Sequence, residues 1–146
     1  MSLIKVFEGD NIGSIAHIEI AYHTDFESWE PAKFKTGKSW QSIPIAGEMA
    51  ELKRKTKDDP NGLVYTYSGF FDIHMIRDEV ELKLLPFVGK RAVLRITDNN
   101  KRVHIIGKPQ NPVLLDEEST TGKLFKHKNG YQFNFLVNQT SPAVSV

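Results

Sequence analysis

The sequence of 146 residues contains no cysteine. This excludes disulfide bonds, thiolate metal sites and a cysteine nucleophile, and it is typical of proteins made in a reducing cytoplasm. No segment has the length and apolarity needed to cross a membrane, and the N-terminal residues MSLIKVFEGD lack the apolar core of a secretory signal. We therefore expect a soluble, non-secreted chain without membrane contact.

The sequence also lacks a strong excess of charge of either sign. Nineteen basic and eighteen acidic residues give a formal net charge of +1. A protein that coats nucleic acid normally carries a clear basic excess, so this balance makes nucleic-acid binding unlikely as a main function. The length is typical of one domain with its own core, and we expect residues 1–146 to form a single domain.

Catalytic and metal-binding motifs are missing as well. The sequence contains no GxSxG, P-loop, GxGxxG or HExxH pattern. His17 and His23 share one face of an expected strand, but six residues of strand separate them by about 20 Å, too far for one metal ion. The adjacent carboxylates of residues 58–59 and 116–118 are expected in turns, where they are solvated alike and make poor acid/base pairs. The sequence predicts no enzyme activity, metal or cofactor.

What the sequence does contain is a series of alternating apolar patterns. Residues 14–23 predict a half-buried strand, and residues 89–107 predict a β-hairpin in which Ala92, Leu94, Ile96, Val103 and Ile105 face the core. Because Asn tolerates positive φ, Asn99-Asn100 suits a two-residue turn. That turn places Ile96 opposite Val103 and Leu94 opposite Ile105. The other face would then carry Arg91, Arg95, Arg102 and His104.

A longer hairpin is predicted from about residue 43 to residue 76, around the turn signal DDPNG at 58–62. Its incoming strand carries the basic run KRKTK at 53–57, and its returning strand is rich in aromatic residues. We expect this hairpin to project beyond the core or to cross the surface of a partner. Its lysines could contact a partner or phosphates, or could protect an exposed edge strand from unwanted pairing.

One short helix is predicted at residues 78–88, because acidic residues begin it and Pro86 and Gly89 end it. Short strands at 113–116 and 120–125 and a core strand at 131–137 follow. With about seven to eight strands and one helix, the fold class is mainly β (α+β). We expect an antiparallel sandwich or barrel whose helix covers one opening.

The segment between residues 24 and 42 loses all periodicity and is predicted to be a long loop. It contains both tryptophans, Trp29 and Trp40, together with Phe34. Large aromatic side chains in such a loop either fold back over the core or anchor a contact with a sugar or another subunit. The same two alternatives apply to Tyr65 and Tyr67 on the long hairpin.

The C-terminal block contains, in order, GKR at 89–91, TDNN at 97–100, GKPQNPV at 107–113, TGK at 121–123, NGYQFNF at 129–135 and SPA at 141–143. This order resembles small, poorly characterised proteins encoded among the virion-structural genes of Bacteroides-type phages and prophages. The resemblance covers roughly residues 64–146. Lys101 departs from it, because a glycine would be expected to follow the two asparagines.

The resemblance implies a phage or prophage virion structural protein, tail-associated or part of a connector, that acts by self-assembly with copies of itself and with other virion proteins. It would be found in the virion, and in the bacterial cytoplasm during expression. The residues expected to form the contacts are Trp29, Phe34, Trp40, Lys53, Lys55, Tyr65 and Tyr67. The alternative is a β-sandwich module that binds a glycan through the loop tryptophans.

Overall fold

The computed structural model describes residues 3–4, 15–29, 32–43, 50–74, 76, 78–89, 91–123 and 130–145. These residues form a five-stranded sheet in the order β11-β8-β7-β1-β4, a four-stranded sheet in the order β5-β6-β10-β9 and a two-stranded sheet of β2 and β3. All pairings are antiparallel. The fold is mainly β, as the sequence predicts.

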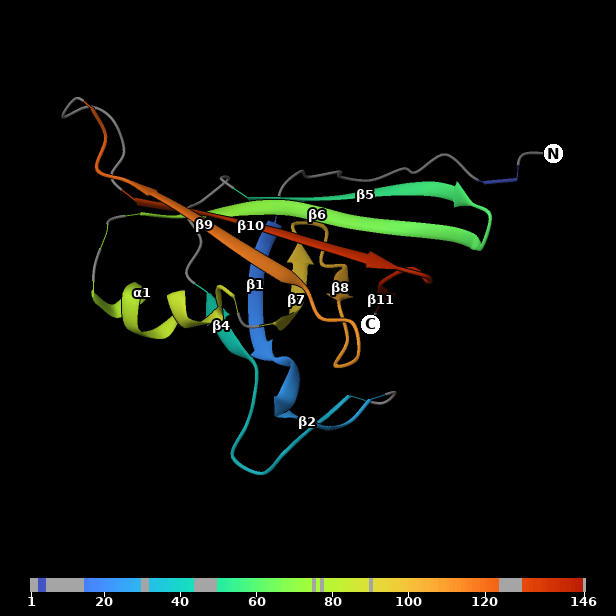
Figure 1. The fold of residues 1–146 in the computed structure, drawn as a ribbon, viewed down its shortest axis with the longest axis horizontal. Helices are drawn as coiled ribbons and strands as arrows, with labels where there is room; N and C mark the ends of the chain where they lie inside the picture. The colour runs from blue at the N-terminus through green and yellow to red at the C-terminus, as the bar shows by residue number, and fades with distance from the viewer. Residues whose placement is uncertain are drawn as a thin grey trace.

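The five-stranded sheet consists of β1 (Ile15–Tyr22), β4 (Gln41–Ile43), β7 (Ala92–Asp98), β8 (Val103–Ile106) and β11 (Val144–Ser145). The four-stranded sheet consists of β5 (Ala50–Asp59), β6 (Gly62–His74), β9 (Leu114–Thr120) and β10 (Gly130–Gln139). In Figure 1 the four-stranded sheet lies across the five-stranded one, with helix α1 (Asp78–Lys83) at one end. The small sheet of β2 (Phe26–Ser28) and β3 (Lys33–Phe34) lies on the side of the five-stranded sheet away from the four-stranded one.

One hydrophobic core fills the space between the two large sheets. Ile18, Ile20, Leu94 and Ile96 contribute from the five-stranded sheet, and β6 and β10 contribute aromatic side chains, all of them at most 4% exposed: Tyr67, Phe71, Tyr131, Phe133 and Phe135. The rings of Phe71 and Phe133 stack with their centroids 5.2 Å apart. Each such buried side chain contributes about 1.5–3 kcal/mol relative to an exposed one, so this layer is the main source of stability.

The strands predicted at residues 14–23 and 131–137 are confirmed as β1 and β10, and the inward-facing residues of β10 are those expected from the alternation. The predicted helix is confirmed in part: α1 ends at Lys83 and is followed by a 3-10 turn, Leu85–Phe87. Val80, Leu84 and Phe87 are buried against the core, which closes one end of the space between the sheets.

Two predictions about segments are wrong. The expected long loop at 24–42 contains a 3-10 turn (His23–Asp25), the strands β2 and β3 and the start of β4. Phe26 and Phe34 are cross-strand neighbours with rings 4.5 Å apart, and this packing stabilises strands that have no sequence periodicity. The acidic residues 116–118 lie within β9, not in a turn, because Leu115 and Glu117 continue the inward alternation opposite Phe135 and Phe133. Residues 124–125 of a predicted further strand lie outside the described residues.

The register predicted for the β7–β8 hairpin is wrong by one residue. Ile96 pairs with His104 and Leu94 with Ile106, because the loop contains a third residue, Lys101, at φ 69°. Both oxygens of Asp98 are used here: Oδ1 accepts the backbone N–H groups of Asn100 and Arg102 at 2.9 and 3.0 Å, and Oδ2 lies 3.2 Å from Nε2 of His104. A type I turn extended by one left-handed residue is a common alternative to the two-residue turn.

A one-residue change of register moves every side chain of the strand to the opposite face. His104 therefore lies on the core side of β8 with Ile106, whereas Ile105 lies on the outer side. The sequence prediction had these two residues the other way round. Arg95 does lie on the outer side, as predicted, next to Ile105 in the register.

The long hairpin exists as β5 and β6, but it does not project freely. β6 pairs with β10 from Tyr65 to His74, so most of it is an interior strand of the four-stranded sheet. Gly69 marks this tight packing: a Cβ built there would lie 2.6 Å from Cζ of Phe135 and even closer to the carbonyl oxygen of Glu51. Only the turn and the outer strand β5 remain open to solvent over a long stretch.

Candidate functional site

The residues predicted to form contacts fall into two groups on different sheets. Trp29, Phe34 and Trp40 belong to an aromatic lobe, defined here as Phe26, Trp29, Phe34 and Trp40, which packs on the outer side of the five-stranded sheet. Lys53, Lys55, Tyr65 and Tyr67 belong to the β5–β6 hairpin of the other sheet. The structure therefore does not bring the seven residues together into one surface.

The aromatic lobe covers the sheet rather than standing open. Phe26 stacks on Phe34, and the rings of Trp29 and Trp40 meet Phe26 edge-on at 5.0 and 5.6 Å. Below these rings lie Ala21 and Val93, which are fully buried although they are on the side of the sheet away from the main core. For Phe34 and Trp40, this packing favours the alternative in which the loop aromatics fold back over the body of the protein.

Arg95 locks Trp40 into this lobe. Its guanidinium lies 5.0 Å from the centre of the Trp40 ring and binds both carboxylate oxygens of Glu19, at 2.9 and 2.6 Å. A bidentate arginine–carboxylate pair fixes the orientation of both side chains, and the arginine also gains a cation–π contact. Trp40 thus packs against Arg95 and against its aromatic neighbours Phe26 and Phe34. Its ring is therefore poorly placed to bind a sugar.

Tyr67 is a further correction. It is only 4% exposed, lies within the main core and accepts a hydrogen bond from the backbone N–H of Ala143 at 2.7 Å. The sequence left two alternatives for this tyrosine, and its choice as a contact residue was wrong because the C-terminal segment packs against it. Tyr65 is half-buried, and the guanidinium of Arg54 lies 5.9 Å from its ring centre. Tyr67 is therefore a structural residue and not an accessible contact residue.

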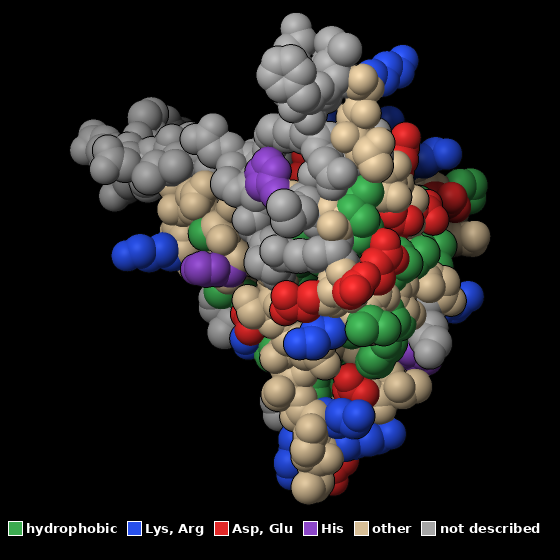
Figure 2. Space-filling view, turned by 90° about the vertical axis from the view of Figure 1, so that its left-hand side faces the viewer, with side chains coloured by type: hydrophobic (Ala, Val, Ile, Leu, Met, Phe, Trp, Pro, Cys, Tyr) green, Lys and Arg blue, Asp and Glu red, His purple; other side chains and the backbone are tan. Residues whose placement is uncertain are grey.

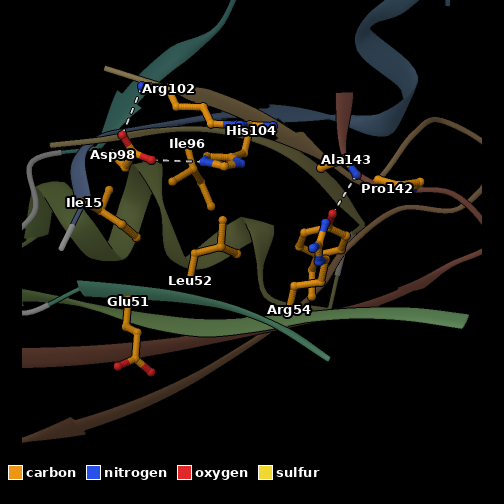
Figure 3. Close-up of a pocket in the computed structure, with 11 residues that line it drawn as sticks. Ile15, Glu51, Leu52, Arg54, Ile96, Asp98, Arg102, His104, Pro142 and Ala143 are labelled. Atoms are coloured by element: carbon orange, nitrogen blue, oxygen red, sulfur yellow. Dashed lines mark hydrogen bonds and ion pairs between the residues drawn. The ribbon is translucent and has the colours of Figure 1, made fainter. Parts of the chain in front are cut away.

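A large cavity lies at the open end between the two sheets, and Figure 3 shows the side chains around it. It has a volume of about 480 Å³. Ile15, Leu52 and Ile96 form its apolar part, while Asp98, Arg102 and His104 come from the β7–β8 hairpin. The C-terminal residues Pro142 and Ala143 form another wall, tied to Tyr67 by the hydrogen bond described above.

The Asp98–His104 pair is the part of this cavity most similar to catalytic machinery. Burial of Asp98 raises its pKa, but hydrogen bonds from the Arg102 and Asn100 backbone and from His104 outweigh burial and hold the pKa below its ordinary value. All of these donors belong to the turn that Asp98 organises. Among the described lining residues there is no Ser, Thr, Cys or Lys that His104 could activate, so the pair is explained by the hairpin itself.

The four-stranded sheet has borders of opposite charge. Within the described part of the chain, β5 and β9 are its outer strands. We define the basic border as Lys53, Arg54, Lys55 and Lys57 on β5, all exposed, and the acidic border as Asp116, Glu117 and Glu118 on β9. Lys53 lies 3.3 Å from Glu51, but this pair is exposed and stabilises little. The sequence predicted the basic border but not the acidic one, because residues 116–118 were expected in a turn.

A second basic group lies on the aromatic lobe, far from these borders. Figure 2 views the molecule from the side of α1: acidic and hydrophobic side chains mix over its middle, and Lys and Arg gather at the lower end, where β2 and β3 lie. The exposed lysines of this segment are Lys33, Lys35 and Lys38. Among the described residues, Lys33 is the one of these three lysines that forms an ion pair, with Glu27 at 3.8 Å.

Other kinds of site find little support in the described residues. They include no group of three or more His, Cys, Asp or Glu side chains that could hold a metal ion. No helix among them has the length and apolarity to span a membrane. Comparison of the chain with protein-family models, with curated proteins and with solved structures finds no match.

Proposed function

We propose that this protein is a non-catalytic structural subunit that assembles head to tail with copies of itself through the two borders of its four-stranded sheet. The observation that carries the proposal is the opposite charge of the basic and acidic borders on one sheet. Lysines on an edge strand discourage pairing with neutral or basic edges, whereas an acidic edge complements them. The same charges that prevent random aggregation therefore select one partner.

The strand directions agree with such an assembly. The order β5-β6-β10-β9 is antiparallel throughout, so β9 of one copy and β5 of the next, placed side by side in the same orientation, also run antiparallel. Pairing would extend the sheet from copy to copy by strand addition. An interface between two different surfaces gives a ring if the rotation closes and a filament if it does not.

The assignment to a virion rests on the resemblance of residues 64–146 to virion-structural proteins of Bacteroides-type phages and prophages. Rings and tubes of small β subunits suit a tail or connector component. The genes that flank this one test the assignment directly. Neighbouring genes for capsid, portal or tail-tape proteins would support it, and a neighbourhood of metabolic genes would contradict it.

The assembly proposal is tested by charge reversal and mixing. The Lys53→Glu/Lys55→Glu/Lys57→Glu variant has two acidic borders, because three glutamates outnumber the remaining Arg54. The Asp116→Lys/Glu118→Lys variant has two basic borders, because two lysines outnumber the remaining Glu117. Each variant alone should lose self-association by at least roughly tenfold. Mixed in equal amounts, the two variants can alternate with complementary borders, and assembly should return. Sedimentation velocity measures both results, and added salt should weaken the wild-type assembly.

The matched control is Lys33→Glu/Lys35→Glu/Lys38→Glu, which makes the same change in net charge as the basic-border variant, but on the aromatic lobe. It should assemble like the wild type. A wild-type protein that remains monomeric at the highest soluble concentration would contradict the proposal. So would an oligomer that is equally sensitive to the border variants and to the lobe control, because net charge alone would then explain the effect.

A further inference from the structure

A second hollow lies beside Trp29, and the residues that line it differ in chemistry from those around the cavity of Figure 3. It is a groove of about 360 Å³ between the β8–β9 connection and the end of β10. Its lining includes Trp29, Gln110, Asn111, Asn138 and Gln139, and Lys108 is the one charged side chain among the described residues that line it. An aromatic ring surrounded by neutral amides is a different environment from the charged rim of the larger cavity.

The amides of this groove are held in fixed orientations. Oε1 of Gln139 accepts the backbone N–H of Gly107 at 2.7 Å, while its Nε2 donates to the carbonyl of Ser141 at 3.1 Å. Nδ2 of Asn111 donates to the carbonyl of Asn138 at 2.6 Å. Oδ1 of Asn138 accepts from the hydroxyl of Thr66 at 2.7 Å. These bonds engage one end of each asparagine side chain and fix where the other end lies.

Fixed amides leave defined hydrogen-bonding capacity for a ligand. An amide carries two donors and an acceptor oxygen with two lone pairs, so Asn111 keeps its Oδ1 acceptor and Asn138 keeps its Nδ2 donors. Gln110 is exposed at the tight turn, where the backbones of Lys108 and Asn111 exchange two hydrogen bonds of 3.1 and 2.9 Å. A ligand that presents paired hydroxyl groups can donate to the first asparagine and accept from the second without reorganising the site.

Trp29 supplies the apolar surface that completes the groove. Its indole is half-buried and is braced edge-on by Phe26 at 5.0 Å, so its position is fixed. Unlike Trp40, it lines a hollow. Sugars have the matching chemistry, because they combine an apolar C–H face that packs on an aromatic ring with hydroxyl groups that bond amides. We propose that this groove binds a neutral oligosaccharide, with Trp29 as the packing surface and Asn111, Asn138 and Gln110 as hydrogen-bonding residues.

The two tryptophans make the proposal directly testable by fluorescence. In Trp40→Phe only Trp29 emits, and in Trp29→Phe only Trp40 emits. We expect titration with chitotetraose, cellotetraose and maltotetraose to shift or quench the emission of Trp40→Phe with at least one of these sugars, and to leave the emission of Trp29→Phe unchanged. No response of Trp29 to any of the three sugars at millimolar concentration would overturn the proposal, as would an equal response of both variants.

A second variant tests the amide side of the groove without touching the aromatic lobe. Gln110→Ala removes one exposed amide at a turn and should fold normally. It should weaken binding of the responding sugar by about fivefold, the usual effect of losing one neutral hydrogen bond. Gln132→Ala, an exposed amide elsewhere on β10, is the matched control and should bind like the wild type. Equal affinities of the two variants would overturn the assigned hydrogen-bonding role.

Discussion

The two hairpins of this protein, β5–β6 and β7–β8, use their charged side chains in different ways. In β7–β8, Arg95 binds Glu19 and covers Trp40, and Asp98 organises its own turn and pairs with His104. In β5–β6, the lysines of the basic border point to solvent, and the aromatic residues of β6 supply buried side chains to the hydrophobic core. Charges of the first hairpin contribute to the fold of the chain itself, whereas those of the second are exposed, and we propose that they contact a partner.

The largest expected effect tests whether β6 is an interior strand. Gly69→Ala places a Cβ against Phe135 and the Glu51 carbonyl, and we expect it to lower the free energy of unfolding by about 3 kcal/mol, near the upper end for overpacking. Urea denaturation measures this. Ser68→Ala, the neighbouring residue on the opposite face, is the control and should change stability by no more than about 0.5 kcal/mol. Equal stability of the two variants would contradict the close packing of Gly69 against Glu51 and Phe135.

The second prediction compares the charges of the two hairpins directly. Arg95→Ala removes two charge-assisted hydrogen bonds and a cation–π contact that are partly shielded from water, and should cost about 2 kcal/mol. Lys55→Ala on the basic border should change stability by less than about 0.5 kcal/mol. Thermal or urea unfolding measures the stability of the two variants relative to the wild type. Similar losses of stability in both variants would contradict the distinction between charges that stabilise the fold and charges that lie exposed to solvent.

The sequence predicted the parts of this fold that depend on alternation along one strand, such as the inward residues of β10 and, from Ile18 onward, those of β1. At the start of β1 a register shift puts Ile15 in the core in place of the expected Ala16. It failed where contacts between distant segments decide the structure. β2 and β3 are held by packing of Phe26 on Phe34 and on the five-stranded sheet, which no local pattern encodes. Tyr67 and the acidic border were misjudged for the same reason, because their exposure depends on which strands lie beside them.

The register of β7–β8 failed for a more local reason. The sequence DNNK allows both a two-residue and a three-residue loop, and the choice depends on the side chain of Asp98. In the observed loop this carboxylate bonds two backbone N–H groups and approaches His104, contacts that a pattern of apolar residues does not contain. Of the proposed functional residues, Trp29 was found from its place in a segment without periodicity, and the lysines from the basic run on a predicted strand. The amides beside Trp29 were not, because they come from segments far apart in the chain.

The third prediction concerns the pH dependence that Asp98 gives to the β7–β8 hairpin. Its pKa is lowered in the folded protein, so its ionised form stabilises the fold above the unfolded value of about 3.8, and this contribution is lost as the pH falls through the folded pKa. Asp98→Asn should cost about 1 kcal/mol at neutral pH, and the difference from the wild type should shrink in acid. Urea titrations at several pH values measure it. A difference independent of pH would show that ionisation of Asp98 is not the source.

The smallest effect tests the three-residue loop that places His104 on the core side. Lys101 has a positive φ of 69°, a conformation that costs a residue with a side chain roughly 1 kcal/mol relative to glycine. Lys101→Gly should therefore stabilise the protein by about 0.5–1 kcal/mol despite the larger entropy of the unfolded chain. Asn100→Gly is the control and should not stabilise, because Asn100 is not among the described residues with positive φ. In a two-residue turn, Asn100 would have positive φ, and Asn100→Gly would then be the stabilising substitution. The signs of the stability changes in Lys101→Gly and Asn100→Gly therefore distinguish the two registers.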